Sequence, residues 1–213
     1  PLVGASLRLM QALGLRRKES VQCRPFAHVM PFTETGLAVD QQQADRYLWV
    51  KGKGGRVRWV PLASPVQQAA LELAQQVVAS RHAHMGAPDR DLKRNLRRFD
   101  YVLEKFGITL RERGATGHGL RHEHLNDAYE GITGVPSPVR GGGPVSPELD
   151  RAARLAVSQL AGHARLRASG ASLGQSAVMG RKPALRAPGA SGVASDSAYL
   201  CCATRRTPSC RGS

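Results

Sequence analysis

The stretch RYLWVKGKGGRVRWVPLASP, residues 46–65, decides the fold. Two runs rich in β-branched and aromatic residues, 46–50 and 56–62, flank the glycine-rich KGKGG, which predicts an antiparallel hairpin with a basic turn. Ser64 and Pro65 then supply an N-cap and a proline at the first helical position. A helix is therefore expected directly after the hairpin.

Helical spacing of apolar residues surrounds the predicted hairpin. The segments with this spacing are residues 2–15, 66–79, 89–107, 117–131 and 147–160. Gly107 and Gly131 are expected to close the third and fourth of these helices. Ser146 and Pro147 start the last one, whose predicted apolar stripe is Leu149, Ala152, Ala153, Leu155, Ala156 and Leu160. The pattern predicts an α+β fold that is mostly helical and carries a small antiparallel sheet.

The balance of charged residues points to a polyanionic partner. Lys and Arg number 31 against 16 Asp and Glu, so the formal net charge is +15. Nucleic acid is the commonest partner of such a chain. No run of about 18 apolar residues and no cleavable leader is visible, so we expect a soluble, cytoplasmic protein without a membrane partner. The cysteines support neither a disulfide framework nor a zinc site, because Cys23 is isolated and the three near the end form no CxxC motif.

Glycine and proline divide the chain into regions. Residues 134–147, GVPSPVRGGGPVSP, interrupt the helical pattern and are predicted to be a flexible insertion loop. From Met179 onward there are few bulky apolar residues, which predicts a disordered basic tail. We therefore expect one domain, 1–178, and a tail, 179–213. The first helix opens without a capping residue, so a truncated N-terminus is also expected.

Two candidate functional residues lie in the first third of the chain. Arg16 stands three residues before Glu19, a spacing at which a helical carboxylate orients a guanidinium; the alternative is an ordinary surface ion pair. Lys53 stands at the tip of the predicted hairpin. It is either a solvated charge at the turn or a flexible ammonium delivered to a phosphate or a leaving oxygen.

The other candidates are histidines and an arginine of the second half. His118 and Arg121 begin a predicted helix, whose N-terminal amide groups favour an anion. His118 and His122 have the spacing of a metal-binding pair, but without an HExxH register or a third ligand zinc is not favoured. His163 ends the last predicted helix, where the alternative role is contact with the helix dipole.

Taken in order, four short motifs resemble those of the tyrosine recombinases, the phage-integrase family. The motifs are LGLRRKESVQCRP (13–25), KGKGGRVRWVPL (51–62), HGLRH (118–122) and QLAGH (159–163). The resemblance covers about residues 1–174 and implies the catalytic domain of that family, without its N-terminal core-binding domain. It implies double-stranded DNA as the partner and strand cleavage and rejoining through a 3′-phosphotyrosyl intermediate. It also implies a homo-oligomer on DNA, a synaptic tetramer, and a bacterial or phage-derived, nucleoid-associated protein.

The resemblance assigns a role to each candidate. Arg16 and Arg121 would clamp the scissile phosphate, and Lys53 would donate a proton to the departing 5′ oxygen. His118 and His163 would provide the remaining contacts to the phosphate and its protons. Phosphoryl transfer depends on preorganised positive donors, and planar guanidinium groups suit phosphate oxygens. No metal and no cofactor is expected.

Ser172 occupies the position, nine residues beyond His163, at which the family carries its tyrosine nucleophile. A phenol can attack and leave again as phenoxide, whereas a serine hydroxyl is less acidic, is shorter in reach and needs an activating base. We therefore expect Ser172 to be a substituted position that does not cleave DNA. Tyr199 in the tail is the substitute considered, since Tyr101 and Tyr129 fall inside predicted helices with the spacing of packing residues.

Three hypotheses about the function of the chain remain open. The first is a site-specific recombinase lineage, and the second is a DNA-binding remnant without chemistry; the two differ at Ser172. The third is a basic RNA-associated protein whose arginines are only counter-charge. The third reading does not explain why Arg, Lys, His-x-x-Arg and His occur in this order.

Overall fold

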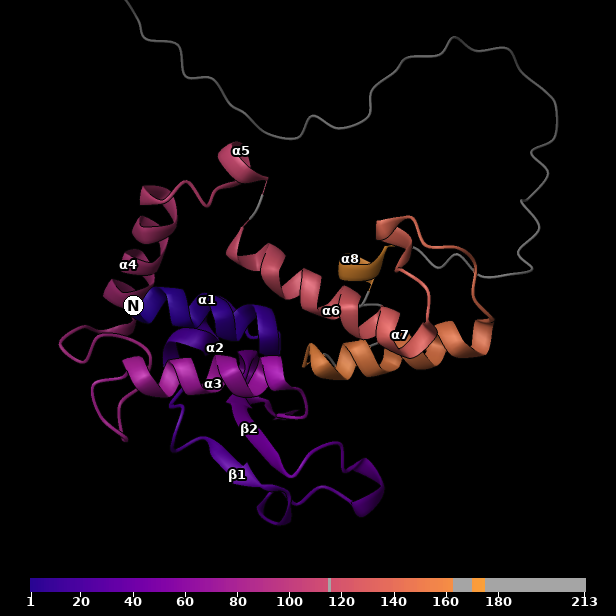
Figure 1. The fold of residues 1–213 in the computed structure, drawn as a ribbon, viewed down its shortest axis with the longest axis horizontal. Helices are drawn as coiled ribbons and strands as arrows, with labels where there is room; N and C mark the ends of the chain where they lie inside the picture. The colour runs from indigo at the N-terminus through magenta and orange to yellow at the C-terminus, as the bar shows by residue number, and fades with distance from the viewer. Residues whose placement is uncertain (115, 163–169, 175–213) are drawn as a thin grey trace, which may run out of the picture. The chain divides into compact units, whose positions relative to one another are not determined.

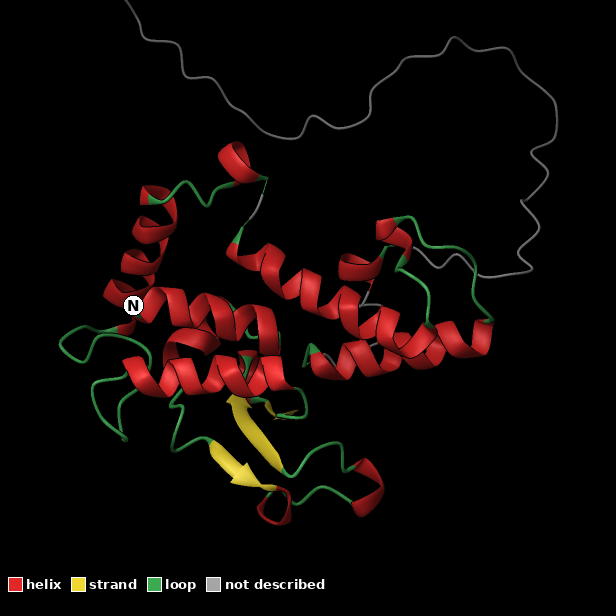
Figure 2. Cartoon of the chain, viewed as in Figure 1, coloured by secondary structure: helices red, strands yellow, loops and turns green. Residues whose placement is uncertain are grey.

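Helices form most of the part of the chain that the structure describes, and one small sheet accompanies them (Figure 1, Figure 2). The structure is a computed structural model that describes residues 1–114, 116–162 and 170–174. Three strands make up an antiparallel sheet in the order β1-β2-β3. The mostly helical α+β class predicted from the sequence is confirmed.

The predicted hairpin is present and forms two of the three strands of the sheet. Strands β2 (Arg46–Lys51) and β3 (Val57–Pro61) pair directly, and β1 (Val29–Pro31) flanks β2. The KGKGG segment contains a single 3-10 turn, η3 (Lys53–Gly55). Leu48 and Val60 face each other in this pairing and are both buried, so one face of the hairpin closes on the core.

Helices α1 (Leu2–Leu13) and α3 (Pro65–Val77) pack against each other over this face, and the short α2 (Arg17–Gln22) lies beside them (Figure 1). Their buried residues, with Leu48 and Val60, form the first core. Ser64 caps α3 as predicted, because its hydroxyl accepts from the Gln67 N–H while the Gln67 side chain accepts from the Ser64 N–H.

Helices α4 (Leu92–Lys105), α5 (Leu110–Arg113) and α6 (Gly117–Thr133) follow. The prediction that Gly131 closes the HGLRH-containing helix was wrong. The helix continues to Thr133, and Gly134 ends it with a φ of 69°. The Gly134 N–H donates to the carbonyl of Glu130 over 2.8 Å, a closure for which a glycine is favoured because its φ is positive.

Helices α7 (Pro147–Leu160) and α8 (Gly170–Leu173) pack on α6 and make a second core. Ser146 caps α7 as predicted. The predicted apolar stripe was wrong in part, because Leu149 and Leu155 are exposed by 37% and 46%. The helix instead turns Ala153 and Val157 toward α6, where both are buried in one cluster with Leu125 and Tyr129.

Residues 134–147 are packed against α6, which differs from the predicted flexible loop. The segment contains a short 3-10 helix, η4 (Pro138–Arg140). The buried Ser137 hydroxyl donates to Asn126 Oδ1 over 2.5 Å, and Arg140 Nη1 lies 2.7 Å from Asp127 Oδ1. Side chains of α6 therefore supply polar partners for this segment, which its glycine-rich composition did not predict. The predicted tail, 179–213, lies outside the described residues.

Candidate functional site

Arg16 stands where α1 has ended and α2 begins. Its backbone N–H donates to Glu19 Oε2 over 2.8 Å, and its Nη1 donates to Glu19 Oε1 over 2.6 Å. The predicted contact between these residues is confirmed, although Arg16 caps the helix with extended backbone angles and is not inside it. Its Nη2 reaches across to the carbonyl of Ala161, 2.9 Å away at the end of α7.

Arg121 reaches the same carbonyl from the opposite direction. It projects from α6, is only 3% exposed, and donates from Nη2 to the Ala161 oxygen over 2.7 Å. Its Nη1 donates to the carbonyl of Gly14, the residue that ends α1. Two arginines far apart in the sequence therefore converge on one oxygen acceptor.

Arg58 is a third member of this group, and the sequence analysis did not identify it. It lies on β3 and donates to the Glu19 carboxylate from both Nη atoms, Nη1 to Oε1 over 3.0 Å and Nη2 to Oε2 over 2.7 Å. The strand pattern could have revealed it. Side chains two positions apart point to the same face of a strand, so Arg58 lies on the same face as Val60 and Leu62, both of which are buried. An arginine at an inward position of a strand requires a buried partner.

These contacts define the arginine cluster, which consists of Arg16, Arg58 and Arg121 around Glu19. Burial alone would raise the pKa of Glu19, but the hydrogen bonds and charge of Arg58, with the hydrogen bonds of Arg16, lower it to about 2. Burial lowers the pKa of Arg121 to about 10, and the charges of Arg16 and Arg58 act in the same direction. Three guanidinium groups against one carboxylate leave an excess of positive charge, which favours an anion.

Exposure differs strongly within the arginine cluster. The Arg16 side chain is 27% exposed, against 9% for Arg58 and 3% for Arg121. Arg16 also lines two cavities, of about 700 Å³ and about 380 Å³, and Gly52 of the hairpin lines both of them. Lys18, Arg24 and Lys51 contribute to the larger one. Arg16 is therefore the member most open to a ligand from solvent, with Arg58 beside it in the smaller cavity and Arg121 more deeply buried.

Histidines of α6 adjoin the arginine cluster. The rings of His118 and His122 pack edge to face, with centroids 4.4 Å apart. Burial lowers the pKa of His118, as do the charges of Arg121 and Arg16. Burial, His118 and Arg121 lower the pKa of His122. Both imidazoles are therefore neutral at pH 7 and able to accept a proton or donate a single N–H.

Ser172 lies on α8, in contact with α6. Its hydroxyl oxygen is 2.9 Å from Nδ1 of His122. Of the tyrosines considered as substitutes, Tyr129 is 1% exposed and packs as predicted, whereas Tyr101 is 52% exposed, so the prediction that it packs was wrong. Tyr101 lies at the surface because the opposite face of α4, which carries Phe99, meets the core.

Three of the residues considered in the sequence analysis lie wholly or partly outside the described part of the chain. His163 lies outside the described residues, as does Tyr199. The backbone of Lys53 begins the hairpin turn η3, which agrees with its predicted place at the tip, and its side chain lies outside the described part. The residues that the structure does bring together are Arg16 and Arg121, with His118 on the same helix as Arg121.

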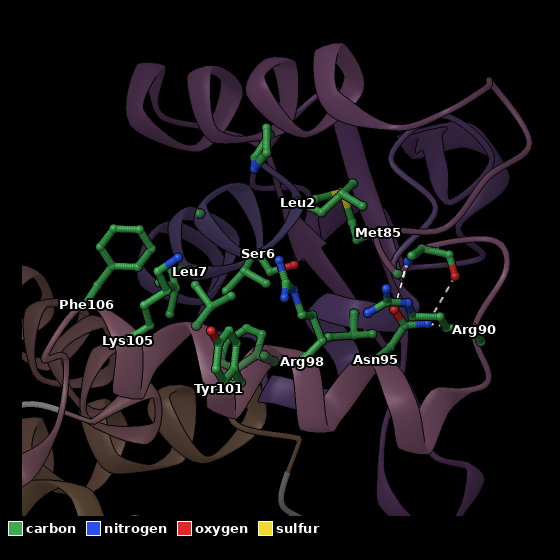
Figure 3. Close-up of a pocket in the computed structure, with 18 of the residues that line it drawn as sticks. Leu2, Ser6, Leu7, Met85, Arg90, Asn95, Arg98, Tyr101, Lys105 and Phe106 are labelled. Carbon is green, nitrogen blue, oxygen red and sulfur yellow. Dashed lines mark hydrogen bonds between the residues drawn. The ribbon is translucent and has the colours of Figure 1, made fainter.

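A separate cavity of about 670 Å³ lies between α1 and α4 and contains none of the predicted site residues (Figure 3). Its labelled apolar side chains include Leu2, Leu7 and Phe106. At one end the Asn95 amide bridges Ala87 and Arg90, as the dashed lines show.

The part of the chain that the structure describes has neither a metal-ligand cluster nor a membrane-spanning helix. There, no three or more His, Cys, Asp or Glu side chains are grouped so that they could hold a metal ion. Among the described helices, none combines the length and the hydrophobicity that a membrane span requires.

Comparison with known proteins identifies the family. The family model described as Integrase matches residues 1–127, so this chain belongs to the integrase family. The match confirms the resemblance to tyrosine recombinases, and three of the four motifs, 13–25, 51–62 and 118–122, lie within the matched residues. The matched range includes Arg16, Lys53, His118 and Arg121 and ends before Ser172.

Two solved structures of the site-specific recombinase XerH are similar to this chain. One is a post-cleavage complex with palindromic difH substrate, at 16% identity and a TM-score of 0.43, covering 80% of this chain and 41% of XerH. The other is a pre-cleavage complex with difH substrate, at 16% identity and a TM-score of 0.42, covering 80% and 42%. The chain thus spans about two fifths of the length of this recombinase. A search of curated proteins found no match.

Proposed function

We propose that this chain binds double-stranded DNA through the arginine cluster, as the phosphate-binding part of a site-specific recombinase domain. The observation that carries the proposal is the shared acceptor: Arg16 and Arg121 both donate to the Ala161 carbonyl, over 2.9 and 2.7 Å. Guanidinium groups that converge on one oxygen are oriented for the oxygens of one phosphate. Membership of the integrase family supports DNA as the source of that phosphate.

Arg16 and Arg121 differ in exposure, which suggests a different role in phosphate binding for each. Arg16 is partly exposed and keeps N–H groups beyond those used by Glu19 and Ala161, so it makes the direct contact with phosphate. Arg121 is buried and contributes positive charge at short range. His118, which is exposed and neutral at pH 7, would add one hydrogen bond. For Lys53 and His163, proton donation and phosphate contact remain predictions from the resemblance.

Ser172 makes the chain a binder of DNA and not a cleaving enzyme in this proposal. Attack by Ser172 would require loss of its proton to a base, and His122 is the neighbour that could take it. The reverse step would then require an alkoxide to leave, which is much harder than departure of a phenoxide. Assembly of several copies on DNA remains a prediction of the resemblance.

Duplex binding tests the phosphate contact. Fluorescence anisotropy with a labelled duplex, measured across a range of salt concentrations, should show weaker binding and a salt slope smaller by about one for Arg16→Ala. Arg8→Ala removes an exposed arginine of α1, outside the arginine cluster, and is the matched control. Equal behaviour of Arg16→Ala, Arg121→Ala and Arg8→Ala would contradict the proposed contact. Tighter binding of single-stranded RNA than of duplex DNA would favour the RNA-associated alternative.

Covalent capture tests the chemistry. A pool of nicked duplexes with a randomised centre would be incubated with the unmodified chain, with Ser172→Tyr and with Ser172→Ala, and then separated on a denaturing gel. We expect an adduct with Ser172→Tyr alone. An adduct with the unmodified chain that disappears in Ser172→Ala would instead establish serine as a working nucleophile, and one that persists and maps to Tyr199 would establish the substitute tyrosine.

A further inference from the structure

Arg58 is the most completely bound member of the arginine cluster. Both of its Nη atoms contact the Glu19 carboxylate, over 3.0 and 2.7 Å, and its side chain is 9% exposed. Glu19 Oε1 also accepts from Arg16 Nη1 over 2.6 Å. One carboxylate oxygen thus connects the arginine of the hairpin to the arginine that faces solvent.

Two glycines enclose this connection. A Cβ on Gly52 would lie 3.2 Å from Arg16 Nη1 and 3.3 Å from Glu19 Oε1. On the other side, a Cβ on Gly162 would lie 3.3 Å from both Cδ and Nη1 of Arg58. The backbone of each glycine therefore lies close to the cluster, and a side chain at either position would displace Arg16, Glu19 or Arg58.

Stability alone is a weak explanation for a buried Arg58. Burial of a guanidinium and a carboxylate costs desolvation free energy that the pair recovers only in part, and an apolar pair of similar size is often at least as stable. Within the described residues, the Arg58 Nε atom is also buried without a hydrogen-bond partner. Such a group adds to the cost, which favours a role beyond packing.

We propose that Arg58 is a positioning residue for phosphate binding: its fork fixes the Glu19 carboxylate, and the carboxylate aims Arg16 at the ligand. The inference rests on the proposed function, because it concerns how the same site meets DNA. Arg58 itself need not touch the phosphate, since each of its Nη atoms donates to Glu19 and its side chain is only 9% exposed.

Removal of Arg58 should act on Arg16 through Glu19. Burial raises the pKa of Glu19, and Arg58 is the main group that opposes this effect. Without Arg58, Glu19 holds Arg16 less firmly, and the guanidinium gains freedom that phosphate binding must then remove.

A double-mutant cycle on the full chain tests the inference, with a labelled DNA duplex as the probe. We expect Arg58→Ala to weaken duplex binding roughly tenfold, in the range of indirect effects through a network. In an Arg16→Ala background the same change should have almost no further effect, because the residue that it positions is gone. Arg56→Ala removes an exposed arginine of the same hairpin, should weaken binding about threefold or less, and should add to Arg16→Ala in full.

A further measurement and a replacement variant keep the test decisive. Carbon-13 NMR of labelled glutamate carboxyls, with Glu19→Gln for assignment, should show that Arg58→Ala raises the pKa of Glu19 while Arg56→Ala does not. If Arg58→Ala does not fold by circular dichroism, Arg58→Lys takes its place, because a lysine keeps the charge and loses the fork.

The inference is overturned if the Arg58 effect adds fully to that of Arg16→Ala, or if Arg58→Ala leaves the pKa of Glu19 unchanged. Failure of the proposed function has a different signature: Arg16→Ala itself then leaves duplex binding unchanged, and the inference falls with it. An inference that fails by itself leaves the Arg16→Ala loss intact.

Discussion

Ser172 and His122 are hydrogen bonded, with 2.9 Å between Oγ and Nδ1, and the bond joins α8 to α6. Burial, together with His118 and Arg121, lowers the pKa of His122, and the neutral ring can either accept a hydrogen bond from the serine hydroxyl or donate one to it. The residue at the expected nucleophile position therefore contributes to helix packing.

Ser172→Ala should lower the free energy of unfolding by about 1 kcal/mol, because one hydrogen bond is lost. Duplex binding should not change. Urea unfolding followed by circular dichroism measures the loss, and the same substitution in a His122→Ala background should cost clearly less. An equal cost in both backgrounds would mean that the two side chains do not interact in solution.

Glu19→Gln should destabilise the protein at pH 7 by about 3 kcal/mol, because it leaves buried guanidinium groups without their counter-charge. The folded-state pKa of Glu19 is about 2, below the ordinary value of 4.5. Its stabilising contribution is therefore complete above pH 4.5 and is lost as the pH falls toward 2. As the pH is lowered across this range, the melting temperature should decrease more steeply for the unmodified chain than for Glu19→Gln.

The control for that comparison is Glu72→Gln, since Glu72 is exposed on α3. Its melting temperature should follow the same pH profile as that of the unmodified chain. A Glu19→Gln profile parallel to both would show that Glu19 is not held ionised by its arginines.

Gly14→Ala should be more destabilising than Gly36→Ala. Both glycines have positive φ, 60° and 71°, so each substitution carries a backbone cost of about 1 to 2 kcal/mol. A Cβ on Gly14 would also lie 2.5 Å from Cδ2 of His124, whereas one on Gly36 would meet nothing within 4 Å. The added overlap should cost at least about 1 kcal/mol more in urea unfolding. Equal costs would indicate that α1 and α6 separate easily at this point.

Tyr129→Phe should lower the free energy of unfolding by about 1 kcal/mol. The Tyr129 hydroxyl donates to Asp150 Oδ1 over 2.7 Å inside the second core, and burial together with Asp150 raises its pKa to about 12. Tyr101→Phe is the matched control, because Tyr101 is exposed on α4. Absorbance titration should show one tyrosine fewer ionising at high pH in Tyr129→Phe than in the unmodified chain. A loss of stability for Tyr101→Phe as large as that for Tyr129→Phe would contradict the assignment.

Local features of the sequence were sufficient for most elements. The hairpin follows from alternation around a glycine-rich turn, and α3 and α7 follow from their caps, because these signals act over a few residues. Helix ends and faces were harder. Either Gly131 or Gly134 could end the helix as judged from the sequence. The hydrogen bond from the Gly134 N–H to the Glu130 carbonyl shows that Gly134 does so. The exposed Leu155 shows that the neighbour of a helix, and not its hydropathy, decides which side is buried.

The sequence identified two of the three arginines of the candidate site, but not the contacts that connect them. Ordered motifs identified Arg16 and Arg121, but their shared acceptor, Ala161, depends on how α2, α6 and α7 meet. Arg58 was overlooked because a charged residue in a strand is usually assigned to the solvent side. Its pairing opposite the buried Val50 identifies it as inward-facing once the hairpin register is known.

The glycine turn of the hairpin consequently has an electrostatic function as well as a conformational one. Gly54 and Gly55 adopt φ values of 74° and 77°, and this tight reversal helps to set Arg58 opposite Val50. A slip of a single position would exchange the two faces of β3 and present a neighbouring apolar side chain to Glu19. Two residues without side chains thus help to determine which charge meets the buried carboxylate.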